Sequence, residues 1–267
     1  MDRSSLYFDL LTGLFKAVAS VRSKFGKKGV LPVIFLRDDI YSLLRNNDKN
    51  KWADSTLSLE WNEDSLNQLL AFRILRASDP DIRDVSLADA QRSIFLVDTI
   101  RLRRRSGERR EVIKYMLART MMRPRDLVSY MRECAKVTLQ RDMYGIDGNV
   151  IKAAEFEYSN RLRSELVDEI QSIIPNVDLI FDQLSIIRKS MFNLVEFERE
   201  VEKIRAKLDT PLPIETISEI LFNFSVFGNV ANQRSNRIFK YMHPKAILNR
   251  REQIIIHQGL LKSLRIV

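Results

Sequence analysis

Residues 119–131 read Arg-Thr-Met-Met-Arg-Pro-Arg-Asp-Leu-Val-Ser-Tyr-Met, and here one helix is expected to end and another to begin. Pro124 favours the first turn of the second helix, where its missing N–H would have lacked a partner anyway. Arg125 is then held at a helix start, beside exposed backbone donors that suit phosphate. The alternative is that Arg125 pairs with an acidic helix and only fixes the turn.

The length of 267 residues allows one large domain or two smaller ones. A hydrophobic content of 45% is enough to form a core, so we expect a globular protein. Forty-four Lys and Arg against thirty-five Asp and Glu favour a polyanionic partner, such as nucleic acid or nucleotide phosphate. The longest apolar run, Val30–Leu36, is far shorter than the ~20 residues of a membrane helix, and the N-terminus lacks a signal-peptide pattern. We expect a cytoplasmic protein without membrane contact.

Cysteine and histidine are too scarce for a disulfide framework or a zinc site. The sequence has one cysteine, Cys134, and two histidines, His243 and His257. Cys134 falls on the apolar side of a predicted helix, so we expect a small buried hydrophobe and no thiol nucleophile. His257 lies in an apolar run, which predicts a packed or capping residue. No metal ligand is predicted.

The N-terminal region predicts a helix followed by a buried strand. Leucine and valine recur every three or four residues, at Leu6, Leu10, Leu14, Val18 and Val21. This helix should end near Gly26, and the β-branched run Val30–Leu36 then favours a strand of a parallel sheet. Arg37 would lie at the carboxyl end of that strand, where ligands bind in α/β sheets, while Asp38 or Asp39 caps a further helix.

Helices dominate the middle of the chain. Asn62, Ser86 and Asn193 are predicted N-caps, and long amphipathic patterns cover residues 149–173 and 177–189. The arginine-rich run 101–110 surrounds a Ser-Gly turn and favours a solvated loop between helices. A nucleic-acid contact there is the less favoured interpretation, because no aromatic residue provides a stacking platform.

Near the C-terminus, a helix carrying Ile217 is followed by Gly228, expected to close it, and by a predicted strand at 238–242. Helices followed by β-strands are the order of a winged helix. Six basic residues around the expected wing are candidates for nucleic-acid binding: Arg234, Arg237, Lys240, Lys245, Arg250 and Arg251. Glutamates crowd the preceding helix, and winged helices also bind proteins.

Taken together, four features resemble the C-terminal half of a bacterial P-loop ATPase of the AAA/STAND type. They are Arg37 after the apolar strand, the Asn-Lys loop followed by Leu59-Glu-Trp-Asn62, the Arg-Thr-x-x-Arg-Pro-Arg-Asp-Leu run, and Asn249–Leu260, which ends in Ile254-Ile-Ile-His-Gln-Gly-Leu260. The resemblance implies an α/β core, a helical lid, a C-terminal winged helix and a role in antiviral defence. It also implies that Arg37 and Arg125 are sensor arginines approaching the γ-phosphate of ATP, with Arg123 sharing that task or pairing with Asp126.

The sequence departs from that family in lacking a G-x-x-x-x-G-K-[ST] loop and an apolar strand ending in acids before Leu31. We therefore expect no ATPase activity and no tight ATP binding by this chain alone, while the intact ATPase would use ATP and Mg²⁺. The chain would be a truncated piece or the sensor-and-lid half of a split or degenerate ATPase. Its partner would be the missing half or a second copy.

The resulting prediction is a mainly α protein with three parts: a remnant of an α/β P-loop core at 1–60, a helical lid domain at 61–190 and a winged-helix-like domain at 191–267. The predicted function is to couple nucleotide state to the binding of a protein or DNA partner. Two alternatives remain: a nucleic-acid-binding winged-helix module without an NTPase role, and an oligomerisation or protein-interaction scaffold that uses the N-terminal apolar stripe.

Overall fold

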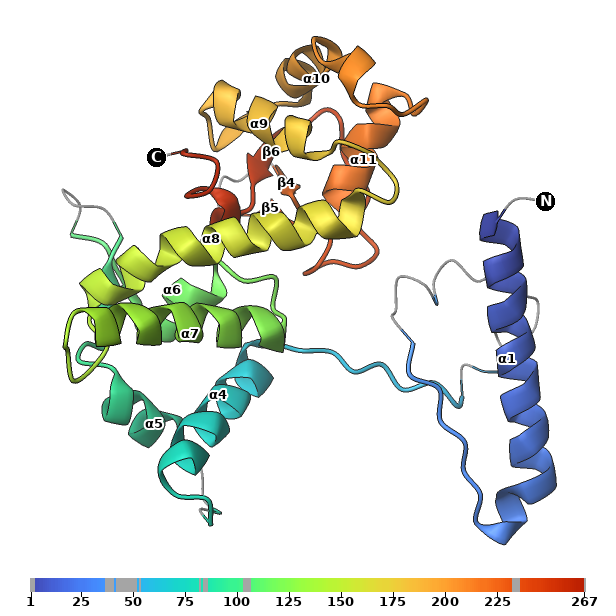
Figure 1. The fold of residues 1–267 in the computed structure, drawn as a ribbon, viewed down its shortest axis with the longest axis horizontal. Coiled ribbons are helices and arrows are strands. Elements are labelled where there is room, and N and C mark those ends of the chain that lie inside the picture. Colours follow the sequence, from blue (N-terminus) through green and yellow to red (C-terminus); the bar gives the residue numbers. More distant parts are fainter. Residues whose placement is uncertain are drawn as a thin grey trace. The chain divides into compact units, whose positions relative to one another are not determined.

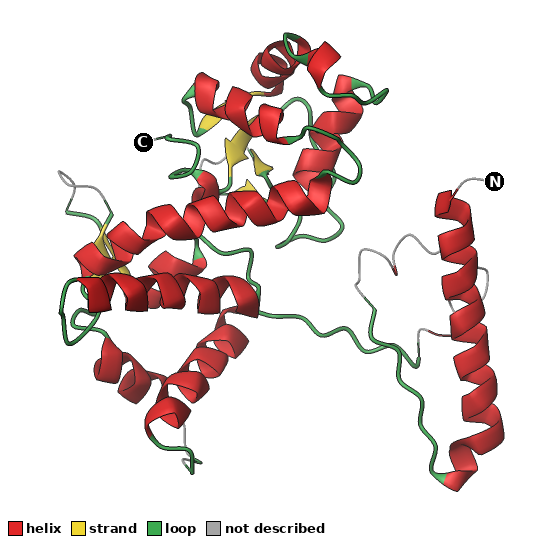
Figure 2. Ribbon diagram, in the orientation of Figure 1, coloured by secondary structure: helices red, strands yellow, loops and turns green. Residues whose placement is uncertain are grey.

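The computed structural model is mainly helical, as the sequence predicts (Figure 1, Figure 2). It divides into two compact units, Met1–Glu60 and Trp61–Val267, which are described separately. The structure describes residues 3–36, 41, 52, 54–81, 83, 86–102, 107–231 and 236–266. Within these residues, no helix is both long enough and apolar enough to cross a membrane.

The first unit is built on one long helix, α1 (Arg3–Phe25), extended by the short helix η1 (Gly26–Lys28). The predicted helix is confirmed, and its end near Gly26 is fixed by Gly29, whose φ of 82° closes the turn in the left-handed region that glycine tolerates. Trp52 stacks on Phe15 of α1, with ring centroids 4.7 Å apart, so this tryptophan is a packing residue.

The strand predicted at Val30–Leu36 is wrong. These residues form no strand with any described residue, and Phe35 is 85% exposed. A β-branched run becomes a strand only where a neighbour pairs with its backbone, and the described residues supply none. Arg37 and the predicted helix caps Asp38 and Asp39 lie outside the described residues.

The second unit begins with two helices whose predicted caps are confirmed. Asn62 caps α4 (Glu63–Ser78) by accepting a 2.8 Å hydrogen bond from the Ser65 N–H, and the Ser65 hydroxyl accepts one from the Asn62 N–H in return. Ser86 caps α5 (Leu87–Ile94) by accepting from the Asp89 N–H. Capping is local chemistry, so sequence spacing was sufficient to place both starts.

The two ends of the arginine-rich run lie in paired strands where the sequence favoured a solvated loop, and residues 103–106 lie outside the described residues. Strands β1 (Thr99–Arg101) and β2 (Arg109–Glu111) pair antiparallel, and α5 ends at Ile94. The backbone just after α5 pairs instead with Ile146, more than fifty residues further on. This pairing joins residues far apart in the sequence, so no local sequence pattern predicts it. It ends the helix and leads the chain into β1.

Three helices follow: α6 (Val112–Leu117), α7 (Pro124–Gln140) and α8 (Gly148–Ile170). Pro124 occupies the first turn of α7, as predicted. α7 and α8 lie side by side (Figure 1), and Tyr130 stacks on Tyr158 with ring centroids 4.6 Å apart. Asp147 caps α8 by accepting hydrogen bonds from two backbone N–H groups.

The C-terminal part alternates helices with short strands. Its elements are α9 (Asp178–Ile187), β3 (Met191–Asn193), α10 (Leu194–Glu202), η2 (Arg205–Lys207), α11 (Ile214–Asn223), β4 (Phe227–Val230), β5 (Arg237–Ile238), β6 (Gln253–Ile256) and η3 (Gln258–Leu260). The four strands form one antiparallel sheet in the order β3-β6-β4-β5.

Two local predictions in this region need correction. The strand predicted at 238–242 is only two residues long, and Gly228 does not close a helix. Gly228 lies inside β4, where an added Cβ would meet the Ile238 carbonyl oxygen at 2.4 Å. The glycine is therefore needed for close strand approach, a use that sequence position alone does not distinguish from helix termination.

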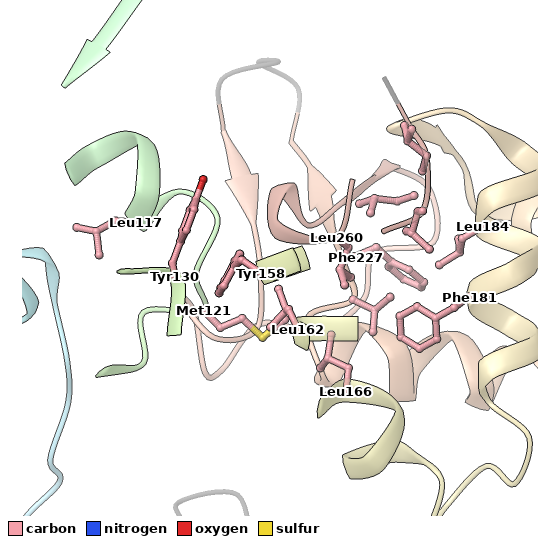
Figure 3. Packing of buried hydrophobic residues seen from close by; sticks show 14 of the residues in the cluster. Leu117, Met121, Tyr130, Tyr158, Leu162, Leu166, Phe181, Leu184, Phe227 and Leu260 are labelled. Carbon is pink, nitrogen blue, oxygen red and sulfur yellow. The ribbon is translucent and has the colours of Figure 1, made fainter. Parts of the chain in front are cut away.

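One hydrophobic core joins the helical and the C-terminal parts of the second unit, and α8 runs through it. Figure 3 shows Tyr158 and Leu162 of α8 between two sets of side chains. One set comes from the α6–α7 region, namely Leu117, Met121 and Tyr130, and the other from the C-terminal part, including Phe181, Phe227 and Leu260. The two parts therefore share a core through α8.

Candidate functional site: an arginine junction

The segment from Arg119 to Arg125, between α6 and α7, is called here the arginine junction. Its backbone turns at Met122, which has a φ of 53°, a value uncommon for residues other than glycine. Asp126, in the first turn of α7, reaches back and accepts a 2.9 Å hydrogen bond from the Met121 N–H. This carboxyl is buried, and burial raises its pKa. Asp126 therefore fixes the turn that positions Arg123 and Arg125.

Arg119 is the buried arginine of the junction. Its Nε lies 2.9 Å from Glu155 Oε1, its Nη1 donates to the Tyr115 carbonyl, and its guanidinium lies 3.4 Å from the centre of the Tyr115 ring. The Tyr115 hydroxyl donates a 2.6 Å hydrogen bond to Glu155 Oε2. Burial raises the pKa of Tyr115, so it keeps the proton it donates. Both Glu155 oxygens are engaged, and Arg119 is a structural residue of the core.

Arg123 and Arg125 point to two glutamates one turn apart on α8. Arg123 Nη1 lies 3.3 Å from Glu169 Oε1, and Arg125 Nη2 lies 3.2 Å from Glu165 Oε2 and 3.5 Å from Glu169 Oε1. The Arg125 side chain remains 59% exposed. Exposed ion pairs of this kind contribute little free energy, commonly about 0–1 kcal/mol. The two arginines are therefore paired but accessible.

The structure places two of the three predicted sensor arginines at one site. Arg123 and Arg125 share Glu169, which is the acidic-helix alternative raised for Arg125, while Arg37 lies outside the described residues. Arg119 and Glu155 were missed as a pair. A signal was present, because Glu155 occupies a core position of α8 between the buried Ala154 and Tyr158, and a carboxylate there needs a partner.

The C-terminal turn η3 lies directly against the junction. An added Cβ on Gly259 would lie 2.2 Å from the Arg119 carbonyl oxygen, and the same oxygen accepts a hydrogen bond from the Tyr158 hydroxyl. His257 is buried, accepts a hydrogen bond from the Gly259 N–H at Nδ1, and packs edge-on against Phe239. The expected packed and capping role of His257 is confirmed.

Burial lowers the pKa of His257 to about 4, against the opposing influence of the nearby Thr120 carbonyl. The imidazole is therefore neutral at neutral pH. Its Nε2 makes no hydrogen bond within the described residues. His257 is therefore a neutral, buried residue that packs between the sheet and the junction, and it is not accessible to solvent as an acid or base.

The six basic candidates around the expected wing differ in their surroundings. Arg250 Nη2 lies 2.7 Å from Glu198 Oε1 of α10, and Lys240 Nζ donates to the Ala246 carbonyl. Three others are exposed and have no ion-pair partner among the described residues: Arg237, Lys245 and Arg251. Arg234 lies outside the described residues.

The outward face of α11 is acidic. Glu215, Glu219 and Asn223 are exposed, while Ile217 and Leu221 are buried against the sheet. No lysine or arginine occurs in α11. A helix entering the major groove of DNA would instead be expected to offer cationic or neutral polar groups to the phosphates and base edges.

Metal and thiol chemistry have no support in the described part of the chain. No group of three or more His, Cys, Asp or Glu residues there is arranged to hold a metal ion. Cys134 is buried, as expected, and burial raises the pKa of its thiol to about 12. A thiol with that pKa stays protonated at neutral pH and is a poor nucleophile.

Comparison with known proteins finds a match to a family model. Residues 82–167 are similar to a family described as the FunZ-associated C-terminal helical domain. The matched range contains α5, the hairpin, α6, the arginine junction, α7 and most of α8. No curated protein and no solved structure matches the chain. The fold and the match together define a protein with a helical domain similar to that FunZ-associated domain.

Proposed function

We propose that residues 61–267 are the lid and winged-helix portion of a P-loop NTPase and couple nucleotide state to partner binding. In this proposal Arg123 and Arg125 contact nucleotide phosphates, while the P-loop, Mg²⁺ and the catalytic parts come from elsewhere, since this sequence has no Walker loop. The observation that carries the proposal is that Arg125, at the start of α7, is exposed and held only by exposed ion pairs. The arginine junction that leads into this helix start also contacts the C-terminal turn, through Arg119 and Gly259.

The chemistry of phosphate binding suits these arginines. Guanidinium groups bind phosphate oxygens in a bidentate manner. The positive end of the helix dipole also attracts an anion at a helix N-terminus, so an arginine there adds to that attraction. The N–H groups of Asp126 and Leu127 at the start of α7 already donate to the Arg123 carbonyl, so the arginine side chains rather than these backbone groups would carry the contact. Glu165 and Glu169 then occupy the place of the phosphate when no nucleotide is present.

The proposed coupling passes through α8. The glutamates that hold the arginines lie on the same helix as Leu162 and Leu166, which belong to the core shared with the C-terminal part. Bound phosphate would release Glu165 and Glu169 from the arginines, so α8 would lose its ion pairs with the junction. The Arg119 carbonyl, packed against Gly259, offers a second contact between the junction and the sheet.

A titration with ATP or inorganic tripolyphosphate tests the proposal on the whole chain. Wild-type protein should bind weakly, and a Glu165→Gln, Glu169→Gln variant should bind about three- to tenfold tighter, because the three competing ion pairs of Arg123 and Arg125 are gone. Adding Arg125→Ala to that variant should abolish the gain. If the glutamine variant binds no better than wild type, or its gain survives Arg125→Ala, the arginines are not the phosphate site.

A second candidate function is protein binding by a winged helix formed by the C-terminal elements. The order α9, β3, α10, α11, β4, β6, with β6 between β3 and β4, supports this interpretation. The acidic outward face of α11 favours a basic protein partner over the major groove of DNA. If α11 stays away from DNA, Glu215→Gln with Glu219→Gln should leave duplex affinity unchanged; a tenfold gain would contradict this.

A further inference from the structure

The hairpin β1–β2 carries arginines on its outward face. Ile100 is 2% exposed and faces Arg110 across the strands, so this pair lies on the inward side. The alternation of strand side chains places Arg101 and Arg109 on the other side, directly opposite each other, and both are exposed. Figure 2 shows the two strands at the edge of the second unit, beside α8.

The charge of these arginines is not balanced within the described part of the chain. Neither Arg101 nor Arg109 has an ion-pair partner there. Glu111 lies on the same face but is engaged by Lys114 at 3.1 Å, and the exposed Glu108 makes no ion pair among the described residues. Like charges directly opposite on paired strands destabilise a hairpin, so the arrangement favours an external anion.

The base of the hairpin is fixed to the core. The Val112 N–H donates to the Asp98 carbonyl, the Leu102 N–H donates to the Glu108 carbonyl, and buried Ile100 belongs to the core cluster. Strand β1 also contacts α6 and α8. The two outward arginines are therefore presented on an ordered ribbon rather than on a free loop.

We propose that this hairpin lies in the major groove of duplex DNA, with Arg101 and Arg109 on its outward face contacting the phosphate backbone. The major groove of B-form DNA admits a two-stranded ribbon, whereas the major groove of A-form RNA is too narrow for side chains to read. No aromatic residue occurs between Asp98 and Glu111, so the stacking surface typical of a single-strand binder is missing. This site is separate from the six basic candidates near the expected wing.

Fluorescence anisotropy with a labelled 20-base-pair DNA duplex tests the proposal on the whole chain. An Arg101→Gln, Arg109→Gln variant should bind about tenfold more weakly in low salt. The slope of log affinity against log salt should fall by roughly 2, since each lost phosphate contact removes about 0.9. Single-stranded DNA and duplex RNA of the same length should bind more weakly than duplex DNA.

The matched control is an Arg92→Gln, Arg199→Gln variant, which removes the same charge from two highly exposed helical arginines. It should change affinity by less than about twofold, and both variants should melt like wild type. Three results would overturn the proposal: no duplex binding by wild type in low salt, equal losses in the two variants, or tighter binding to single strands or duplex RNA. If duplex affinity falls only when Arg237 and Arg251 are substituted, the DNA site lies at the wing and not on the hairpin.

Discussion

Arg119 Nε lies 2.9 Å from Glu155 Oε1, and both side chains are nearly enclosed, with 14% and 4% of their surfaces exposed. The pair joins α8 to the first residue of the arginine junction. The Tyr115 hydroxyl uses the second oxygen of Glu155, so the carboxylate is held from two sides. The junction is therefore fixed to α8 by a buried ion pair at one end and by exposed ion pairs at the other.

Removing Glu155 should be costly, because it leaves the Arg119 charge buried without a partner. We expect Glu155→Ala to lower the free energy of unfolding by about 3–5 kcal/mol. Glu165→Ala, which removes an exposed pair on the same helix, should cost less than about 1 kcal/mol. Urea denaturation measures both, and a similar small cost for the two variants would show that the buried pair does not hold the junction.

Gly259 should resist substitution because the space for a side chain is taken by backbone. An added Cβ would lie 2.2 Å from the Arg119 carbonyl oxygen, which cannot move as a flexible side chain would. We expect Gly259→Ala to destabilise the protein by about 1–3 kcal/mol. Gly148→Ala is the control, since a Cβ added at that position would meet no atom within 4 Å. Equal thermal shifts for the two variants would contradict close packing of the C-terminal turn.

Stability should fall as pH is lowered from 7 to 5 because of His257. Its folded pKa of about 4 lies below the ordinary value of 6.5, so the unfolded chain binds the proton first. The stabilisation is complete above pH 6.5 and is lost as pH falls towards 4. Between pH 7 and 5 the loss from this residue should be about 2 kcal/mol.

His257→Asn is the matched variant for that experiment, because its amide oxygen can still accept the hydrogen bond from the Gly259 N–H. Urea unfolding of the two proteins at pH 7 and pH 5 isolates the contribution of His257, since His243 and all carboxyl groups are the same in both. The variant should show the smaller decrease. An identical decrease in both proteins would mean that His257 is not buried in its neutral form.

Cys134 should be unreactive in the native protein. The side chain is buried, and burial raises its pKa to about 12, so almost no thiolate exists at pH 8. A colorimetric thiol reagent should modify it only after denaturant is added, with the single cysteine then giving one equivalent. Complete modification of the native protein within minutes would contradict the packing between α7 and α8.

Local chemistry explains which elements could be predicted from the sequence. Asn62, Ser86 and Pro124 each mark a helix start through contacts within a few residues, and all three starts are confirmed. The run at 30–36 and the paired strands at 99–101 and 109–111 could not be predicted correctly, because a strand depends on its neighbour. Arginines in the hairpin also carried a stronger loop signal than strand signal.

The candidate site likewise has one part that local sequence predicts and another that depends on long-range packing. The Arg-Pro-Arg spacing placed Arg123 and Arg125 at a helix start, which α7 bears out. Their partners Glu165 and Glu169 are about forty residues away, and only the packing of α7 on α8 brings them together. The contact between Gly259 and Arg119 joins residues 140 positions apart and carries no pattern in the sequence beyond the glycine itself.

Hydrogen–deuterium exchange can show whether the arginine junction passes a phosphate signal to the C-terminal sheet. The Glu165→Gln, Glu169→Gln variant would be measured with and without saturating tripolyphosphate. We predict changed exchange in residues 119–126 and also in β6 and η3, residues 253–260, with both changes lost on adding Arg125→Ala. Exchange that changes only at 119–126, or nowhere, would contradict the coupling.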